Sequence, residues 1–265
     1  MKSGRRPRPS LARALAESLA EPIPNKTLKR AIGDGDSDYE RYLRTAELLA
    51  LQTPKDQLVH RDEHLFQIVH QSQELWLSLV AHEAVGVVEA IEEGELVAAL
   101  DRAARMARVF DVLERDIRVL DTLSPAAFMV IRKSLGQGSG LESPGYNALQ
   151  LAAPVVAQAL EEALGPLVEV YRKDAPTVAY RLCEQLVDVD AGYQRWLMAH
   201  FLLVRRTLGV HRTVSALDGF PTTALPKRMV RALFPELWDV RVKLTQGWSA
   251  EGGFEPGADR SAESS

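Results

Sequence analysis

Residues 62–93 read DEHLFQIVHQSQELWLSLVAHEAVGVVEAIEE, and this stretch indicates the class of fold to which the chain belongs. Its apolar side chains recur at the three- and four-residue spacing of an α-helix for roughly eight turns, and Gly94 is a typical residue to end such a helix. A helix of that length spans a whole domain, so we expect the remaining segments to pack around it. The apolar positions are Leu65, Phe66, Val69, Trp76, Leu79, Val80, Val87, Val88 and Ile91.

The rest of the chain also has helical periodicity. A second long helix is predicted over 96–120, and a third begins at Ser124-Pro125, where serine is a favourable N-cap and proline a favourable first residue. Almost no segment shows the alternating β-branched pattern of a strand. The sequence therefore predicts an all-α fold, a bundle with long central helices. The other predicted helices are 38–51, 146–164, 166–186, 190–209 and 225–245.

Composition excludes several classes of protein. Lysine and arginine total 32 residues against 36 acidic residues, a formal net charge of −4, which argues against a nucleic-acid partner. The single cysteine, Cys183, excludes an intramolecular disulfide and an all-cysteine metal site. No apolar run approaches the ~18 residues of a membrane span, and the basic start leads into prolines instead of a signal sequence. We expect a cytoplasmic protein without a membrane partner.

Three regions are expected along the chain. Residues 1–35 combine arginine, proline and the Gly33-Asp34-Gly35 turn, and we interpret them as a mobile N-terminal arm. Residues 36–246 form the helical domain. Residues 247–265 are rich in glycine, serine and acidic side chains, which is typical of a disordered C-terminal tail.

Two of the six histidines lie in unusually apolar surroundings. His70 follows Phe66-Gln67-Ile68-Val69, and His200 lies within WLMAHFLLV, residues 196–204. A buried imidazole needs a partner, and the ordinary interpretation is a core histidine bonded to a carbonyl or carboxylate. A single histidine on an apolar helix is also what a haem iron requires. Periodicity alone does not choose between the two.

The residues around His70 form a pattern that is more specific than periodicity. Residues 66–76, FQIVHQSQELW, resemble the pattern F-x-x-x-H-Q-x-x-E-L-W of the tryptophan 2,3-dioxygenase family. Four further segments resemble blocks of that family in the same order, so the resemblance extends over residues 38–242. These segments are 39–54, 123–140, 182–206 and 234–241.

The resemblance implies an all-helical oxygenase that holds haem b and uses dioxygen as cosubstrate. Such enzymes are usually homotetramers, so we expect a homo-oligomer, a tetramer or a dimer. His200 matches the proximal iron ligand, whose second ring nitrogen should have an acceptor, and Trp196 and Ser139 would lie beside the haem. His70 matches the distal histidine, which in the family faces the dioxygen and the indole N–H.

The resemblance also implies a pocket for an aromatic amino acid. Phe66 would pack on the indole, and Arg132 would hold the substrate carboxylate with a planar, bidentate guanidinium. Phe128 stands where the family often has tyrosine, and Tyr39 and Tyr42 would line a neighbouring subunit's pocket. Ordinary roles remain open: an exposed helix arginine for Arg132, a helix cap for Ser139, and helix packing for the two tyrosines.

One segment departs from the family. After the proximal helix the family has a Gly-Thr-Gly-Gly loop that contacts the substrate ammonium group, whereas residues 209–219 here read GVHRTVSALDG. The residue that contacts the ammonium group is therefore not predicted. We expect a divergent oxygenase that acts on tryptophan or a substituted tryptophan in secondary metabolism.

Two reactions remain open for such an enzyme. Dioxygenation would cleave the 2,3-bond of the indole and give an N-formylkynurenine-type product. Monooxygenation would insert one oxygen atom and give a 2-oxindole-type product. A haem-binding sensor or carrier without turnover is the alternative from another functional class.

Overall fold

The computed structural model describes residues 11–173, 175–215, 217, 219, 221–224, 226 and 231–246. The chain divides into two compact units, Met1–Leu58 and Val59–Ser265. Each unit is described by itself. None of the helices in these described ranges is both long enough and apolar enough to cross a membrane.

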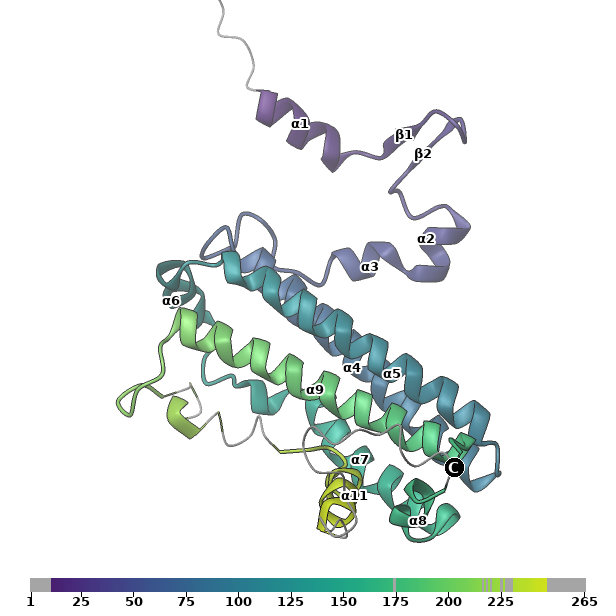
Figure 1. Ribbon diagram of the computed structural model, residues 1–265. Coiled ribbons are helices and arrows are strands. Elements are labelled where there is room, and N and C mark those ends of the chain that lie inside the picture. Colours follow the sequence, from purple (N-terminus) through teal and green to yellow (C-terminus); the bar gives the residue numbers. More distant parts are fainter. Residues whose placement is uncertain are drawn as a thin grey trace, which may run out of the picture. The chain divides into compact units, whose positions relative to one another are not determined.

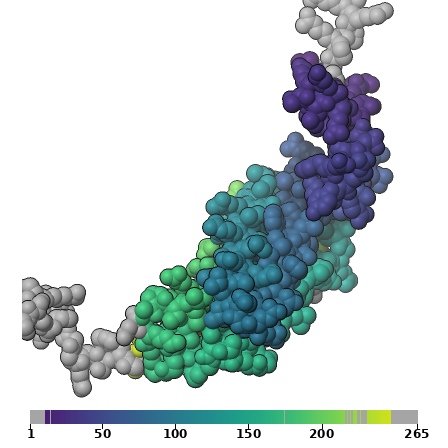
Figure 2. All heavy atoms as spheres, turned by 90° about the vertical axis from the view of Figure 1, so that its right-hand side faces the viewer, coloured from purple at the N-terminus to yellow at the C-terminus, as the bar shows by residue number. Residues whose placement is uncertain are grey.

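The larger unit is built on three long helices, α4 (Glu63–Glu92), α5 (Leu96–Ile117) and α9 (Val178–Thr207). Helix α5 packs against both α4 and α9, and α7 (Pro144–Leu164) packs against α4 (Figure 1). The space-filling view shows the atoms of α4 and α5 packed side by side on one face of this unit (Figure 2). The predicted all-α bundle with long central helices is confirmed.

Shorter elements complete this unit. Helix α6 lies at one end of the bundle, and α8 and α11 lie toward the other end (Figure 1). The bounds are η1 Arg118–Thr122, α6 Pro125–Ser134, η2 Gly140–Glu142, α8 Leu167–Tyr171, η3 Thr222–Ala224 and α11 Pro235–Gln246.

Local signals explain where α6 and α7 begin. The Ser124 hydroxyl accepts a hydrogen bond from the Ala127 N–H at 3.1 Å, and Pro125 is the first residue of α6, as predicted. The same Ser-Pro signal begins α7 at Ser143-Pro144. Glycine then lets α7 approach α4, because a Cβ atom at Gly145 would lie only 2.4 Å from the Cβ of Leu77.

The prediction of separate helices at 166–186 and 190–209 is wrong. Helix α8 ends at Tyr171, and α9 continues without a break from Val178 to Thr207. Pro176 precedes Thr177, whose hydroxyl caps α9 by accepting from the Tyr180 N–H at 3.1 Å. The predicted break at 187–189 does not form.

The predicted helix at 225–245 also differs from the observed one. Helix α11 starts at Pro235, and residues 231–234 are not helical. Residues 225 and 227–230 lie outside the described ranges. The predicted C-terminal tail, residues 247–265, lies outside them too.

The smaller unit contains α1 (Leu11–Ala20), an antiparallel hairpin of β1 (Ile23–Asn25) and β2 (Arg30–Ile32), α2 (Asp38–Leu43) and α3 (Thr45–Leu49). The predicted helix 38–51 is broken at Arg44, which adopts a positive φ of 53°. Residues 11–35, the described part of the segment expected as a mobile arm, contain regular structure, and the smaller unit extends to Leu58.

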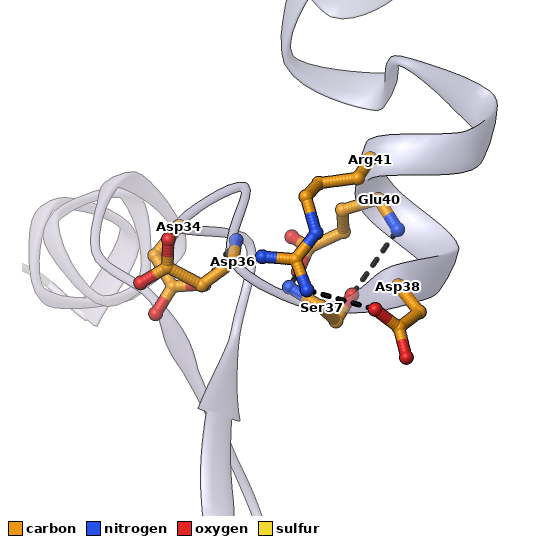
Figure 3. A network of polar contacts seen from close by, with 6 residues as sticks. All are labelled: Asp34, Asp36, Ser37, Asp38, Glu40 and Arg41. Atoms are coloured by element: carbon orange, nitrogen blue, oxygen red, sulfur yellow. Dashed lines mark hydrogen bonds and ion pairs between the residues drawn. The ribbon is translucent and has the colours of Figure 1, made fainter.

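A capping box begins α2 (Figure 3). The Ser37 hydroxyl accepts from the Glu40 N–H at 3.1 Å, and the Glu40 carboxylate accepts from the backbone N–H groups of Ser37 at 3.2 Å and Gly33 at 2.6 Å. Arg41 donates to Asp38 at 2.8 Å in the same turn. This network links the end of the hairpin to α2.

A buried carboxylate fixes α11 to α9. Asp190 is fully buried on α9, and its Oδ2 atom accepts from the Phe234 N–H and from the Trp238 indole N–H, each at 2.9 Å. Gln194 donates to Oδ1 at 3.0 Å. The charge is therefore satisfied by three neutral donors, which explains why aspartate is accommodated inside a helix and a core.

We predict that Asp190→Ala lowers the free energy of unfolding by about 3 kcal/mol, because the Phe234 and Trp238 N–H groups lose their acceptor in a buried site. Urea unfolding measures this change. Asp188→Ala, two positions earlier and exposed, is the control and should change stability by less than about 0.5 kcal/mol. Similar losses for both variants would contradict a role of Asp190 in docking α11.

Candidate functional site

Two imidazoles, His70 on α4 and His200 on α9, interact electrostatically. The pKa of His200 is lowered to about 4, mainly by burial and to a smaller extent by electrostatic interaction with His70. The two rings are therefore near enough to interact. Burial also lowers the pKa of His70, although the Phe66 carbonyl, Glu74 and Asp116 act in the opposite direction. Both rings are therefore neutral at pH 7, which is the form that binds metals.

The orientation of His70 is set by its own helix. The Nδ1 atom lies 2.7 Å from the Phe66 carbonyl oxygen, and because a carbonyl only accepts, Nδ1 carries the proton. The imidazole also packs on the Phe66 ring, with centroids 4.0 Å apart. This tautomer leaves Nε2 as a hydrogen-bond acceptor for another molecule.

His200 lies beside η2. A Cβ atom at Gly140 would lie 4.0 Å from the His200 Cε1 atom, so the loop passes close to the imidazole. In the described ranges no residue accepts a hydrogen bond from His200, and the acceptor expected for its second nitrogen is not found there. The ring nitrogens are thus not committed to another described side chain.

Phe66, Phe128 and Arg132 come together near α6. The Phe66 and Phe128 rings have centroids 6.0 Å apart, and Phe128 and Arg132 are four residues apart on α6 and therefore share a face. The Arg132 Nη2 group donates to the Ser215 carbonyl at 2.8 Å. The predicted clamp is thus anchored to the loop that follows α9, and its other N–H groups make no hydrogen bond to a described residue.

Sequence reasoning missed the residue that shapes this loop. Thr222 is fully buried, and its hydroxyl donates to the Val214 carbonyl at 3.1 Å while its N–H donates to the same oxygen at 3.0 Å. The His211 N–H points to the Thr222 hydroxyl at 3.3 Å. Nothing in the local sequence indicates these contacts, because they join residues 8–11 positions apart in an irregular loop.

Ser139 and Trp196 have other partners in the structure. The Ser139 hydroxyl caps η2 by accepting from the Leu141 N–H at 3.2 Å, which matches the ordinary role considered for it. The Trp196 indole donates to Gln73 Oε1 at 2.6 Å. Tyr39 and Tyr42 belong to the smaller unit, where they are 70% and 87% exposed.

Glu74 is a second residue that sequence reasoning missed. One turn after His70, its carboxylate accepts from the Ser143 hydroxyl and, at 2.9 Å, from the Gly145 N–H. It thereby holds the start of α7, next to η2, against α4. The Ser-Pro pair at 143–144 is the sequence signal that could have pointed to this contact. It marks the start of a helix, and the N-terminus of a helix attracts a negatively charged side chain such as that of Glu74.

The donor set fits a haem better than a free ion. Within the described ranges, no three His, Cys, Asp or Glu side chains gather closely enough to hold a metal ion. A single neutral imidazole with unengaged nitrogens suits a macrocycle that brings four nitrogen ligands of its own. His200 would hold the iron of such a group.

Comparisons with known proteins find similarity to tryptophan 2,3-dioxygenases. The family model for tryptophan 2,3-dioxygenase matches residues 25–153, which include His70 and Arg132 but not His200. The curated tryptophan 2,3-dioxygenases of Myxococcus xanthus and Xanthomonas oryzae are 28% and 29% identical, with 80% of this chain and 91% and 89% of theirs covered. The Bacillus cereus enzyme is 28% identical, with 78% and 92% covered.

We predict a pH-dependent stability for the haem-free protein. Because the pKa of His200 falls from the ordinary 6.5 to about 4 on folding, the unfolded chain binds the proton more readily. The stabilisation is complete above pH 6.5 and is lost as the pH falls toward 4. Unfolding free energies should therefore decrease less steeply between pH 7 and pH 5 in His200→Gln than in the wild type. The exposed His82→Gln variant should keep the wild-type slope, and equal slopes in all three proteins would contradict the prediction.

Proposed function

Because the chain belongs to the tryptophan 2,3-dioxygenase family, we propose that it is a haem-dependent oxygenase that oxidises the indole ring of tryptophan or a substituted tryptophan with dioxygen. The observation that carries the proposal is a set of side-chain contacts: Phe66 packs on His70, Phe128 packs on Phe66, and Arg132 shares the α6 face of Phe128. The imidazole of His200 interacts electrostatically with His70. Haem b is the proposed cofactor, and His200 its iron ligand. The bound haem would supply the activation of dioxygen.

The residues around His70 bind and orient the indole in this proposal. The protonated Nδ1 of His70 is held by the Phe66 carbonyl, so Nε2 accepts a hydrogen bond from the indole N–H. The Phe66 and Phe128 rings cover the apolar faces of the substrate and exclude water. Holding the indole in one orientation lowers the barrier because fewer arrangements have to be sampled.

Arg132 binds the carboxylate of the amino acid. A guanidinium forms two parallel charge-assisted hydrogen bonds with a carboxylate, and only Nη2 of Arg132 is engaged, by the Ser215 carbonyl. A haem sensor or carrier has no need of a carboxylate clamp, so Arg132 favours an enzyme over that alternative.

Two reactions fit this pocket and differ in their electron balance. Ring cleavage adds both atoms of dioxygen to the substrate and needs no external electrons. Monooxygenation adds one atom and releases the other as water, which requires two electrons and two protons from a separate reductant. The loop 209–222, closed by Thr222 in place of a glycine-rich segment, is the observation that keeps monooxygenation as the second candidate.

We also infer a homo-oligomer, a tetramer or a dimer. The exposure of Tyr39 and Tyr42 on α2 leaves both rings available for a neighbouring subunit's pocket, as in the family the chain resembles. A cytoplasmic location remains part of the proposal.

Labelled dioxygen tests the reaction. We expect haem-loaded protein to convert tryptophan, or 5-methyltryptophan as a substituted analogue with a free C2 position, into a product that retains ¹⁸O by mass spectrometry. Two labelled atoms formed without a reductant indicate ring cleavage, and one labelled atom formed only with ascorbate indicates monooxygenation. Absence of turnover and of any substrate effect on the Soret band would contradict the proposed function.

The two histidines should give different phenotypes. His200→Ala is expected to lose haem, and free imidazole should restore binding by filling the place of the side chain. His70→Ala should retain haem but react about tenfold more slowly, because it loses one orienting hydrogen bond. Haem titration and single-turnover rates measure these effects. Stoichiometric haem with unchanged iron ligation in His200→Ala would remove the assignment of the iron ligand.

Arg132→Ala should weaken substrate binding about 30- to 150-fold, since it removes a charge-assisted contact worth roughly 2–3 kcal/mol. Indole lacks the carboxylate, so its dissociation constant should hardly change. Lys133→Ala, the exposed neighbour on α6, is the matched control for charge and position. An unchanged affinity for the amino acid in Arg132→Ala would show that the clamp is misassigned.

A further inference from the structure

A buried glutamine links the helices that carry the two imidazoles. Gln73 on α4 is 5% exposed, and its Nε2 group donates to the Leu113 carbonyl at 3.2 Å and to the Asp116 carboxylate at 2.9 Å, both on α5. Its Oε1 atom accepts the indole N–H of Trp196 on α9 at 2.6 Å. One side-chain amide thus joins α4, α5 and α9.

This hydrogen bond lies one helical turn from both histidines. Gln73 follows His70 by three residues, and Trp196 precedes His200 by four, so the members of each pair share a helix face. Trp196 is 7% exposed, and its ring lies against Phe110 with centroids 6.2 Å apart. The indole is therefore held on one side by packing and on the other by the amide.

The separation of α4 and α9 depends on such side-chain contacts. Helix α4 packs chiefly on α5 and α7, and α9 packs chiefly on α5, so the two helices reach each other mainly through α5 and through side chains between them. The Gln73–Trp196 hydrogen bond is a direct link across this space.

We propose that Gln73 is a positioning residue, which through the Trp196 indole sets how His200 faces His70 and thereby the ligand affinity of a haem held between them. This inference rests on the proposed function and extends it to a residue that does not touch the substrate. The amide fits its partners in a way that other side chains do not. A glutamate would bring a second negative charge to Asp116, and a leucine would leave the indole N–H unpaired.

The test compares haem-loaded Gln73→Leu with haem-loaded Gln150→Leu. Gln150 on α7 donates to the Tyr193 hydroxyl on α9 at 3.1 Å, so its replacement removes the same kind of amide–aromatic hydrogen bond to the same helix without involving α4. We expect Gln73→Leu to change the cyanide dissociation constant of the ferric protein about tenfold and to shift the iron–histidine vibration. Gln150→Leu should change cyanide binding less than about twofold.

Trp196→Phe removes the same hydrogen bond from the other side. This variant tests the proposal even if Gln73→Leu does not fold. It keeps an aromatic ring and removes the donor, so it should reproduce the shifts of Gln73→Leu. The double variant should show no further change, because both substitutions remove one interaction. In the haem-free protein, hydrogen exchange of the Trp196 indole N–H should be faster in Gln73→Leu than in the wild type.

The outcomes separate this inference from the proposed function. A less stable Gln73→Leu protein with wild-type cyanide affinity and vibration overturns the positioning role and leaves the oxygenase intact. Equal shifts in Gln73→Leu and Gln150→Leu overturn it as well, because they indicate general loosening. A wild-type chain that binds no haem overturns the proposed function, and the positioning role with it, before any variant is compared.

Discussion

The packing of α5 between α4 and α9 holds the larger unit together. Its apolar face buries Phe110, Leu113 and Ile117 almost completely, and each of these side chains would lose its contacts if either neighbouring helix moved away. Close approach to α9 is possible because residue 192 is glycine; a Cβ atom there would lie 2.8 Å from that of Phe110. The two histidines are carried by helices that share this one partner, so α5 determines where both imidazoles lie.

Buried polar groups then fix how these helices are aligned along their axes. Glu83 on α4 is 3% exposed and pairs with Arg105 at 2.6 Å and Arg102 at 3.2 Å on α5. If the helices shifted along their axes, these groups would lose their partners and leave a buried charge or hydrogen-bonding group unpaired. Apolar contacts alone carry no such penalty, because one apolar side chain can replace another. Asp190 acts in the same way between α9 and α11. The first pairing joins two consecutive helices, and the second joins residues 44 positions apart. Together they specify one arrangement of a mostly apolar bundle.

The sequence predicts those parts of the molecule that have local causes. The apolar period over 62–93 gives α4 almost to the residue, and the Ser124-Pro125 pair gives the start of α6, because both signals act within a few turns. The motif around His70 marks the segment whose side chains meet Phe128. By contrast, the partners of Trp196, Arg132 and Thr222 are not foreseeable. The Gln73–Trp196 bond spans 123 residues and the bond from Arg132 to Ser215 spans 83, and no local pattern encodes either.

The charges around His70 show why its imidazole remains neutral although two carboxylates are near it. Glu74 and Asp116 both favour a proton on the ring, whereas burial disfavours it and is the larger effect on its pKa. Each carboxylate is already held by neutral donors, Ser143 and Gly145 for Glu74, and Ser72 and Gln73 for Asp116. Hydrogen bonds to neutral donors stabilise a carboxylate without a nearby cation. A neutral His70 with a free Nε2 acceptor is thus chiefly a consequence of burial, which outweighs both carboxylates.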